Sequence, residues 1–241
     1  MAGWVKKKAD IRRGELLDSA QALFFSKGYE ATTIVDIMEC ASVSKGGFYH
    51  HFSAKEDLLE ALAERMAAGS VVRLQPILEE HGLDAVARMN AVLSQSRQFK
   101  VEDAGAIRAA FDAVFKPENI ALYHRLNRAV SKVMLPLFAD ILRQGKNEGR
   151  FRIDDPTTTA EIIMQLGAST HDSVARAIEA SGTAHAEAAA VALEERLRQQ
   201  GIAIDRILGL PDGTIIFSEP GFAAAVMSAP DAGGTDLIKT I

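Results

Sequence analysis

One short stretch of the sequence gathers small and polar residues that suit contact with a nucleic acid. It contains Ser44, Lys45, Gly46, Gly47, Tyr49 and His50. Two adjacent glycines near the start of a helix each cost about 1 kcal/mol relative to alanine, so we expect the backbone here to approach another molecule closely. Hydroxyl groups, ammonium groups and the free amides of a helix start can bind phosphates and base edges. DNA is the partner that this chemistry favours.

Helical periodicity predicts that two short helices carry this stretch. The first has apolar residues at i, i+3, i+4 and i+7, namely Ile34, Ile37, Met38 and Ala41. Thr32 and Thr33 are candidates for its N-cap, and Ser44 can cap a second helix over 45–51. That second helix would hold its phenylalanine inward and its polar residues outward.

A longer helix over 9–27 is predicted before this pair. Two short helices joined by a tight turn and set on a longer helix form a helix-turn-helix, whose second helix enters the DNA major groove. Downstream, Ser53 and Glu56 have the spacing of a capping box, which predicts the start of a fourth helix. Lys55, in the first turn of that helix, is placed to reach a phosphate.

The remaining sequence predicts an all-α fold. Further helices are expected over 83–100, 104–115, 118–148, 156–180 and 184–208. Pro136 should kink the third of these. A turn over 211–213 is expected to lead into a short strand over 214–217. Residues 218–241 are expected to be loosely held apart from a short helix over 221–228.

Composition and motifs exclude several classes of function. The single cysteine, Cys40, cannot form an internal disulfide, and we expect it to be a half-buried core thiol. The histidines lack metal-ligand spacing, and the sequence has no glycine-rich phosphate loop and no nucleophile elbow. We therefore expect no metal, no cofactor and no enzymatic activity. No apolar run is long enough to span a membrane and no signal peptide is evident, so we expect a cytoplasmic protein without a membrane partner.

The net charge of −5 argues at first against a nucleic-acid partner. The basic residues are unevenly distributed, however, and five of them crowd the N-terminus, namely Lys6, Lys7, Lys8, Arg12 and Arg13. Lys45 and Lys55 flank the helix expected to enter the groove. We therefore expect modest non-specific affinity for DNA that is strongly sensitive to salt.

Two segments, GYEATTIVDI over 28–37 and ASVSKGGFYHHFSAKEDLL over 41–59, resemble the TetR family of one-component transcriptional repressors. The resemblance covers about residues 9–62, and beyond them the similarity is architectural. It implies an N-terminal three-helix helix-turn-helix domain over 1–55 and a C-terminal helical bundle over 56–210 for effector binding and dimerisation. Residues 211–241 would form a C-terminal tail.

The resemblance also implies which residues contact DNA. Together with the cap positions, the expected set is Thr32, Thr33, Ser44, Lys45, Gly46, Gly47, Tyr49, His50 and Lys55. By position, Thr33, Tyr49, His50 and Lys55 would contact phosphates. The family often carries Thr, Ser or Ala where this chain has Gly47, so one base contact is expected to be missing.

An effector pocket in the C-terminal bundle should combine apolar residues with a few polar ones. The candidates are Met89, Arg108, Phe111, Phe115, His124, Met134, Met164, Gln165 and His171. Core packing is the alternative for each of them taken singly. The small and apolar residues of the helices over 156–180 and 184–208 predict a two-fold interface with a second copy.

The sequence therefore predicts a ligand-responsive transcriptional repressor. It would bind a pseudo-palindromic, double-stranded operator as a homodimer, and a small-molecule effector would release it. Two alternatives stay open: a helical small-molecule-binding or catalytic protein without a DNA function, and a DNA-binding activator.

Overall fold

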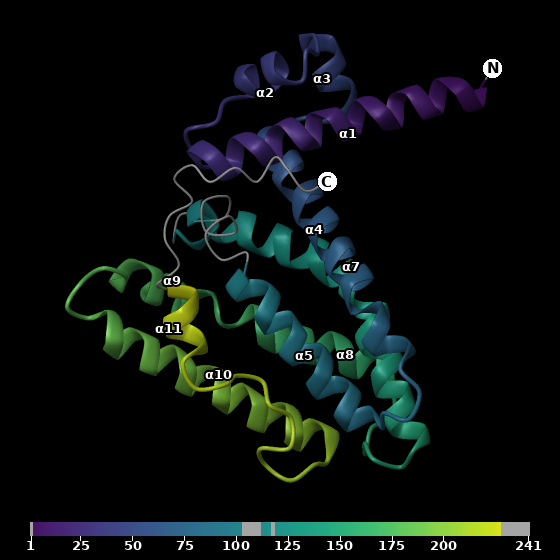
Figure 1. Ribbon diagram of the computed structural model, residues 1–241, viewed down its shortest axis with the longest axis vertical. Coiled ribbons are helices and arrows are strands. Elements are labelled where there is room, and N and C mark those ends of the chain that lie inside the picture. The colour runs from purple at the N-terminus through teal and green to yellow at the C-terminus, as the bar shows by residue number, and fades with distance from the viewer. Residues whose placement is uncertain (1, 103–111, 117–118, 228–241) are drawn as a thin grey trace.

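The computed structural model of this chain describes residues 2–102, 112–116 and 119–227. Three helices form the N-terminal unit: α1 (Ala2–Lys27), α2 (Ile34–Cys40) and α3 (Lys45–His51). Figure 1 shows them gathered at one end of the molecule. The backbone of α1 is helical from Ala2, so the basic N-terminal segment continues the first helix, which is longer than the predicted 9–27.

The remaining helices form the larger unit, and the first of them leads away from the N-terminal unit (Figure 1). They are α4 (Lys55–Glu79), α5 (Ala85–Glu102), η1 (Asp112–Phe115, a single 3₁₀ turn), α7 (Ile120–Asn147), α8 (Pro156–Ala168), α9 (His171–Ala180), α10 (Ala186–Leu208) and α11 (Phe222–Met227). Every element in the part of the chain that the structure describes is helical, which confirms the all-α prediction.

The N-terminal core is shared between the two units. Its fully buried members from the helix-turn-helix include Phe24, Ile37 and Phe48, which pack with residues of α4. Tyr123 and Leu126 of α7 belong to the same buried cluster. Packing is therefore continuous across the predicted domain boundary at residue 55, and the start of α7 is anchored in the core of the helix-turn-helix unit.

A second core lies between the long helices. It joins α4, α5, α7, α8 and α10, with Leu74, Val92, Leu142 and Leu208 fully buried. α7 runs without interruption through Pro136, and the kink expected there stays a prediction.

Three local predictions are wrong. The helix predicted over 156–180 is two helices, because the hydroxyls of Ser169 and Thr170 donate to the carbonyls of Leu166 and Gly167 (both 2.7 Å) and so end α8. The capping box at Ser53 does not form. Ala54 is the N-cap residue of α4 and makes no side-chain cap bond.

The third wrong prediction concerns the C-terminal segment. Residues 214–217 form no strand, since their amides bind side chains or nearby carbonyls of the same segment instead of a neighbouring strand. The fully buried Asp205 carboxylate accepts the amides of Gly213, Thr214 and Ile215 (2.6–3.2 Å). Arg97 of α5 donates to the carbonyl of Ile216 at 2.6 Å. Residues 211–227 are therefore held against α5 and α10, and the expected turn over 211–213 and the short helix α11 are confirmed.

Candidate nucleic-acid interface

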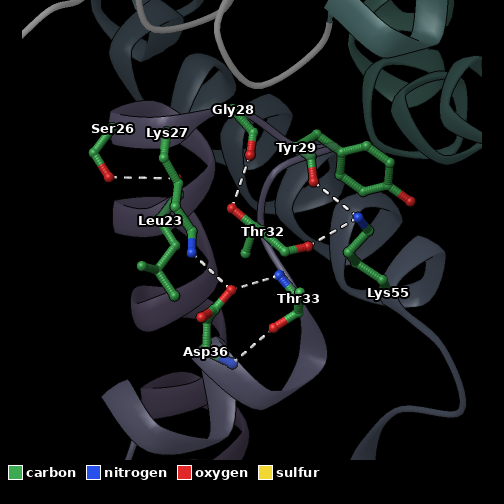
Figure 2. A network of polar contacts seen from close by, with 9 residues as sticks. All are labelled: Leu23, Ser26, Lys27, Gly28, Tyr29, Thr32, Thr33, Asp36 and Lys55. Carbon is green, nitrogen blue, oxygen red and sulfur yellow. Dashed lines mark hydrogen bonds and ion pairs between the residues drawn. The ribbon is translucent and has the colours of Figure 1, made fainter.

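Side-chain caps fix the start of both short helices. The Thr33 hydroxyl accepts from the Asp36 amide (3.1 Å), and the Asp36 carboxylate accepts from the Thr33 amide (2.7 Å). Lys27 at the end of α1 donates to the same carboxylate at 2.7 Å (Figure 2). These hydrogen bonds lower the pKa of Asp36 to about 2, and the bond from Lys27 has the largest effect. The start of α2 is thereby joined to α1.

The start of α3 is capped as the sequence predicts. The Ser44 hydroxyl accepts from the Gly47 amide at 3.2 Å, while the turn before it takes Ser42 into the left-handed region at φ 51°. A residue with a Cβ atom adopts this region at a cost, so the turn between α2 and α3 holds some strain.

The helix α3 presents one buried and one exposed face. Phe48 is fully buried, and its ring meets Tyr49 edge-on with 5.2 Å between ring centroids. Tyr49 is 50% exposed, and Lys45 and His50 are exposed as well. This places an aromatic hydroxyl, an ammonium group and an imidazole on the outer face of the helix.

The two glycines of α3 have different roles. A Cβ atom at Gly46 would meet no other atom within 4 Å, so this backbone position is open to an approaching molecule. A Cβ atom at Gly47 would lie 2.8 Å from the Val43 side chain. The glycine at 47 therefore permits packing within the protein, which explains why a larger residue is missing there.

Two residues of the expected DNA-contacting set bind backbone carbonyls within the protein. Thr32 is fully buried and its hydroxyl donates to the Gly28 carbonyl at 2.8 Å, so its side chain is not available to DNA. The Lys55 ammonium group donates to the carbonyls of Tyr29 (2.8 Å) and Thr32 (2.9 Å) and lies 4.1 Å from the centre of the Tyr29 ring (Figure 2). Burial lowers the pKa of Lys55. Both residues hold the loop between α1 and α2.

The expected effector-binding residues are dispersed. Met89 and Met134 pack in the second core, Met164 is half-buried, and His124 and Gln165 are exposed. Arg108 and Phe111 lie outside the described residues. A hollow of about 460 Å³ between α4, α5 and α7 is lined by none of these residues that the structure describes.

Phe115 and His171 do meet. Their rings stack with 5.9 Å between centroids, and Tyr123 meets His171 edge-on at 4.4 Å. The His171 Nδ1 atom lies 3.0 Å from a carboxylate oxygen of Asp172, and Nε2 lies 3.3 Å from the Val114 carbonyl. This aromatic cluster of Phe115, Tyr123 and His171 connects α9 to η1 and to the start of α7.

Known proteins show the same two-part organisation. A family model described as "Bacterial regulatory proteins, tetR family" matches residues 16–62, and one described as "Tetracyclin repressor-like, C-terminal domain" matches residues 105–174. The HTH-type transcriptional repressor KstR2 of Mycobacterium tuberculosis is 30% identical over 158 residues, which cover 62% of this chain and 74% of the relative. The chain belongs to the TetR family. As a member, it is a ligand-responsive transcriptional repressor that carries a DNA-binding helix-turn-helix.

Further similar proteins match part or most of the chain. The repressor AcnR of Corynebacterium diphtheriae is 40% identical over 78 residues, covering 32% of this chain and 39% of that relative. The crystal structure of RolR in complex with resorcinol superposes with a TM-score of 0.61 and 20% identity, covering 93% of this chain and 97% of RolR. FadR of Thermus thermophilus, in complex with lauroyl-CoA, gives a TM-score of 0.51 and 19% identity over 78% of this chain and 92% of that protein. At these identities the structural likeness concerns the fold.

Residues missed by the sequence analysis join this TetR-family helix-turn-helix to the rest of the chain. Tyr123 lies in the aromatic cluster, and Arg125 binds two carboxylates of α4. The hydrogen bonds of Tyr123 to Ala168 and of Arg125 to Asp57 each cross more than forty residues of sequence, so only the apolar spacing of Tyr123 could have indicated its burial.

The remaining predictions concern single groups. Cys40 is exposed, so its predicted place as a half-buried core thiol is wrong. The described residues contain no group of three histidine, cysteine or acidic side chains that could hold a metal ion. Within the same described ranges, no helix is long and apolar enough to cross a membrane.

Proposed function

We propose that this TetR-family repressor binds a pseudo-palindromic operator as a homodimer, with the two copies of α3 in successive major grooves. The observation that carries the proposal is the division of α3 into a buried face at Phe48 and an exposed face at Tyr49. A capped, seven-residue helix held rigidly by its buried phenylalanine can present its first residues to base edges. We propose Lys45, Gly46 and Tyr49 as the residues nearest the bases.

The other proposed contacts are with the DNA backbone. Thr33, Ser44 and His50 lie at the helix starts or on the outer face of α3, where amides and hydroxyls can bind phosphates. We leave three of the expected residues out of the proposed contact set. The side chains of Thr32 and Lys55 bind backbone carbonyls of the protein itself, and a side chain in place of Gly47 would meet a neighbouring side chain. Residues 1–55 remain our proposed DNA-binding unit, with residues 56–210 for effector binding and dimerisation and 211–241 as a C-terminal extension.

A second copy of the chain would cover exposed apolar side chains. Ile162 on α8 is 50% exposed and Val191 on α10 is 62% exposed. Pairing of these helices with their two-fold mates would bury both side chains. A dimer also doubles the operator contacts, which a protein whose net charge is −5 needs for specific binding.

The effector is proposed to be a small organic molecule with an aromatic or acyl part, in keeping with the ligands of RolR and FadR. Its binding would disturb the aromatic cluster of Phe115, Tyr123 and His171, which joins α9 to the core shared with the helix-turn-helix. A hundredfold loss of operator occupancy requires that the effector prefer the released state by about 2.7 kcal/mol.

Selection of random duplexes by the purified full-length protein tests the proposal. We expect enrichment of two inverted half-sites spaced by about one helical turn or somewhat more, with two chains bound per site. Enrichment of a single asymmetric site bound by one chain would contradict the homodimer. No enrichment at all would contradict the assignment of α3 as the recognition helix.

A further inference from the structure

An arginine from α7 binds two carboxylates at the start of α4. Its guanidinium Nη2 atom lies 2.8 Å from Asp57 Oδ1 and 2.6 Å from Glu60 Oε2, and its Nε atom lies 3.0 Å from the same Glu60 oxygen. All three side chains are about one-third exposed. Arg125 therefore makes charge-assisted bonds from the effector-binding part of the chain to the helix that follows α3.

Asp57 stands between Arg125 and the turn that carries α3. Its second oxygen, Oδ2, accepts from the Ser53 amide at 2.9 Å, and Ser53 lies two residues beyond the end of α3. The hydrogen bond from Arg125 is the largest cause that lowers the pKa of Asp57. A carboxylate held ionised in this way can fix the Ser53 amide, and with it the angle between α3 and α4.

The position of Arg125 is itself fixed by buried neighbours. Tyr123 and Leu126, on either side of it in α7, belong to the same buried core as Phe48 of α3. The Tyr123 hydroxyl also donates to the Ala168 carbonyl at the end of α8, at 3.0 Å. A shift of α7 relative to the first core would therefore move the guanidinium away from Asp57.

We propose that Arg125 is a positioning residue for operator binding. It acts through Asp57 and the Ser53 amide, and sets the orientation of α3 from the effector-binding part of the chain. The proposal rests on α3 being the recognition helix. It differs from a direct contact of Arg125 with DNA and from a contribution of Arg125 to stability alone.

The test compares Arg125→Gln with Lys132→Gln. Lys132 lies on the same helix and faces α4, but its side chain is 79% exposed and its ammonium group lies 3.6 Å from a Glu64 carboxylate oxygen, so Lys132→Gln is a matched loss of one charge. Fluorescence anisotropy would measure affinity for the duplex that the wild-type protein selects, across a range of salt concentrations. Hydrogen exchange would follow the Ser53 amide, and thermal melting would report stability.

Arg125→Gln should weaken operator binding about tenfold, within the usual range for coupling between distinct sites. The slope of affinity against salt should stay unchanged, because no phosphate contact is lost. The Ser53 amide should exchange faster, whereas Lys132→Gln should match the wild type in affinity and in exchange. A fall of about one unit in the salt slope would make Arg125 a phosphate contact, and equal affinities of Arg125→Gln and wild type would also overturn the proposal.

A double variant tests the route through Asp57. Because both changes break the same link, Asp57→Asn combined with Arg125→Gln should bind no more weakly than the worse single variant, and additive losses would overturn the proposal. If Arg125→Gln does not fold, Arg125→Lys replaces it, since lysine keeps the charge but cannot bind both carboxylates with a planar fork. Failure of the wild-type protein to select any duplex would contradict the assignment of α3, and so is separate from these outcomes.

Discussion

The sharpest test of the recognition helix is the change Tyr49→Ala. Tyr49 is 50% exposed on the outer face of α3, while Phe48 beside it is fully buried. Loss of the tyrosine side chain should therefore remove operator contacts and leave most of the core in place. The expected result is a large loss of affinity together with a small loss of stability.

Both magnitudes follow from the position of the side chain. One good contact with a base or phosphate contributes about 1–3 kcal/mol, and the proposed homodimer would lose two of them. A total of about 2–6 kcal/mol corresponds to a loss of operator affinity of about 30-fold to 10⁴-fold. Truncation of a fully buried aromatic ring costs about 3–5 kcal/mol, so the half-buried Tyr49 should cost about 1–2 kcal/mol of stability. That corresponds to a fall in melting temperature of about 2–8 °C.

Anisotropy of a labelled, selected duplex and a thermal melt would measure the two effects separately. Val72→Ala is a suitable control, because Val72 is also apolar and exposed (71%) but lies on α4, away from α3. Tyr49→Phe keeps the ring and removes the hydroxyl, so it divides the loss between ring contact and hydrogen bonding. Wild-type affinity of Tyr49→Ala in a folded protein would refute the assignment of α3 as the recognition helix.

Three further changes test local features of the same unit. Ser42→Gly should raise the unfolding free energy by about 0.5–1 kcal/mol, because glycine tolerates φ 51°. A thermal melt measures this, and an unchanged or lower melting temperature would contradict it. Lys55→Met should lower the melting temperature and leave the salt slope of DNA binding unchanged, because the ammonium group binds two backbone carbonyls. A salt slope reduced by about one unit would instead indicate that Lys55 contacts a phosphate. His51 has its pKa lowered from 6.5, by burial first and then by nearby positive charge. As pH falls through 6.5 the unfolded chain takes up this proton before the folded one, so stability should decline from pH 7.5 to 5.5, and the decline should be smaller in His51→Gln. Parallel melting curves of the two proteins against pH would argue against this role.

The sequence by itself determined the helix-turn-helix and its exposed face. Thr33 and Ser44 cap helices that begin one residue later, so the signal for each cap lies within four residues. The same applies to Phe48 and Tyr49, whose opposite burial follows from the helical period. Local hydrogen bonding and periodicity decide such features, and both can be read from a short stretch of sequence.

Other features depend on partners that are distant in the sequence. The place of Lys55 in the first turn of its helix predicts a contact with DNA, but its hydrogen-bond partners are carbonyls 23 and 26 residues away. The break between α8 and α9 depends on hydroxyls that compete for helix carbonyls, a choice that apolar spacing alone cannot predict.

Only the tertiary structure decided how the helix-turn-helix is joined to the rest of the chain. Arg125 and Asp57 are 68 residues apart, and neither has a local pattern that pairs them. The buried Asp205 carboxylate binds the amides of a segment whose residues indicated a turn and a short strand. The physical reason is the same in both cases. A charged side chain is stabilised by whichever donors or acceptors the packed helices bring to it, and that choice is made only when the two cores have formed.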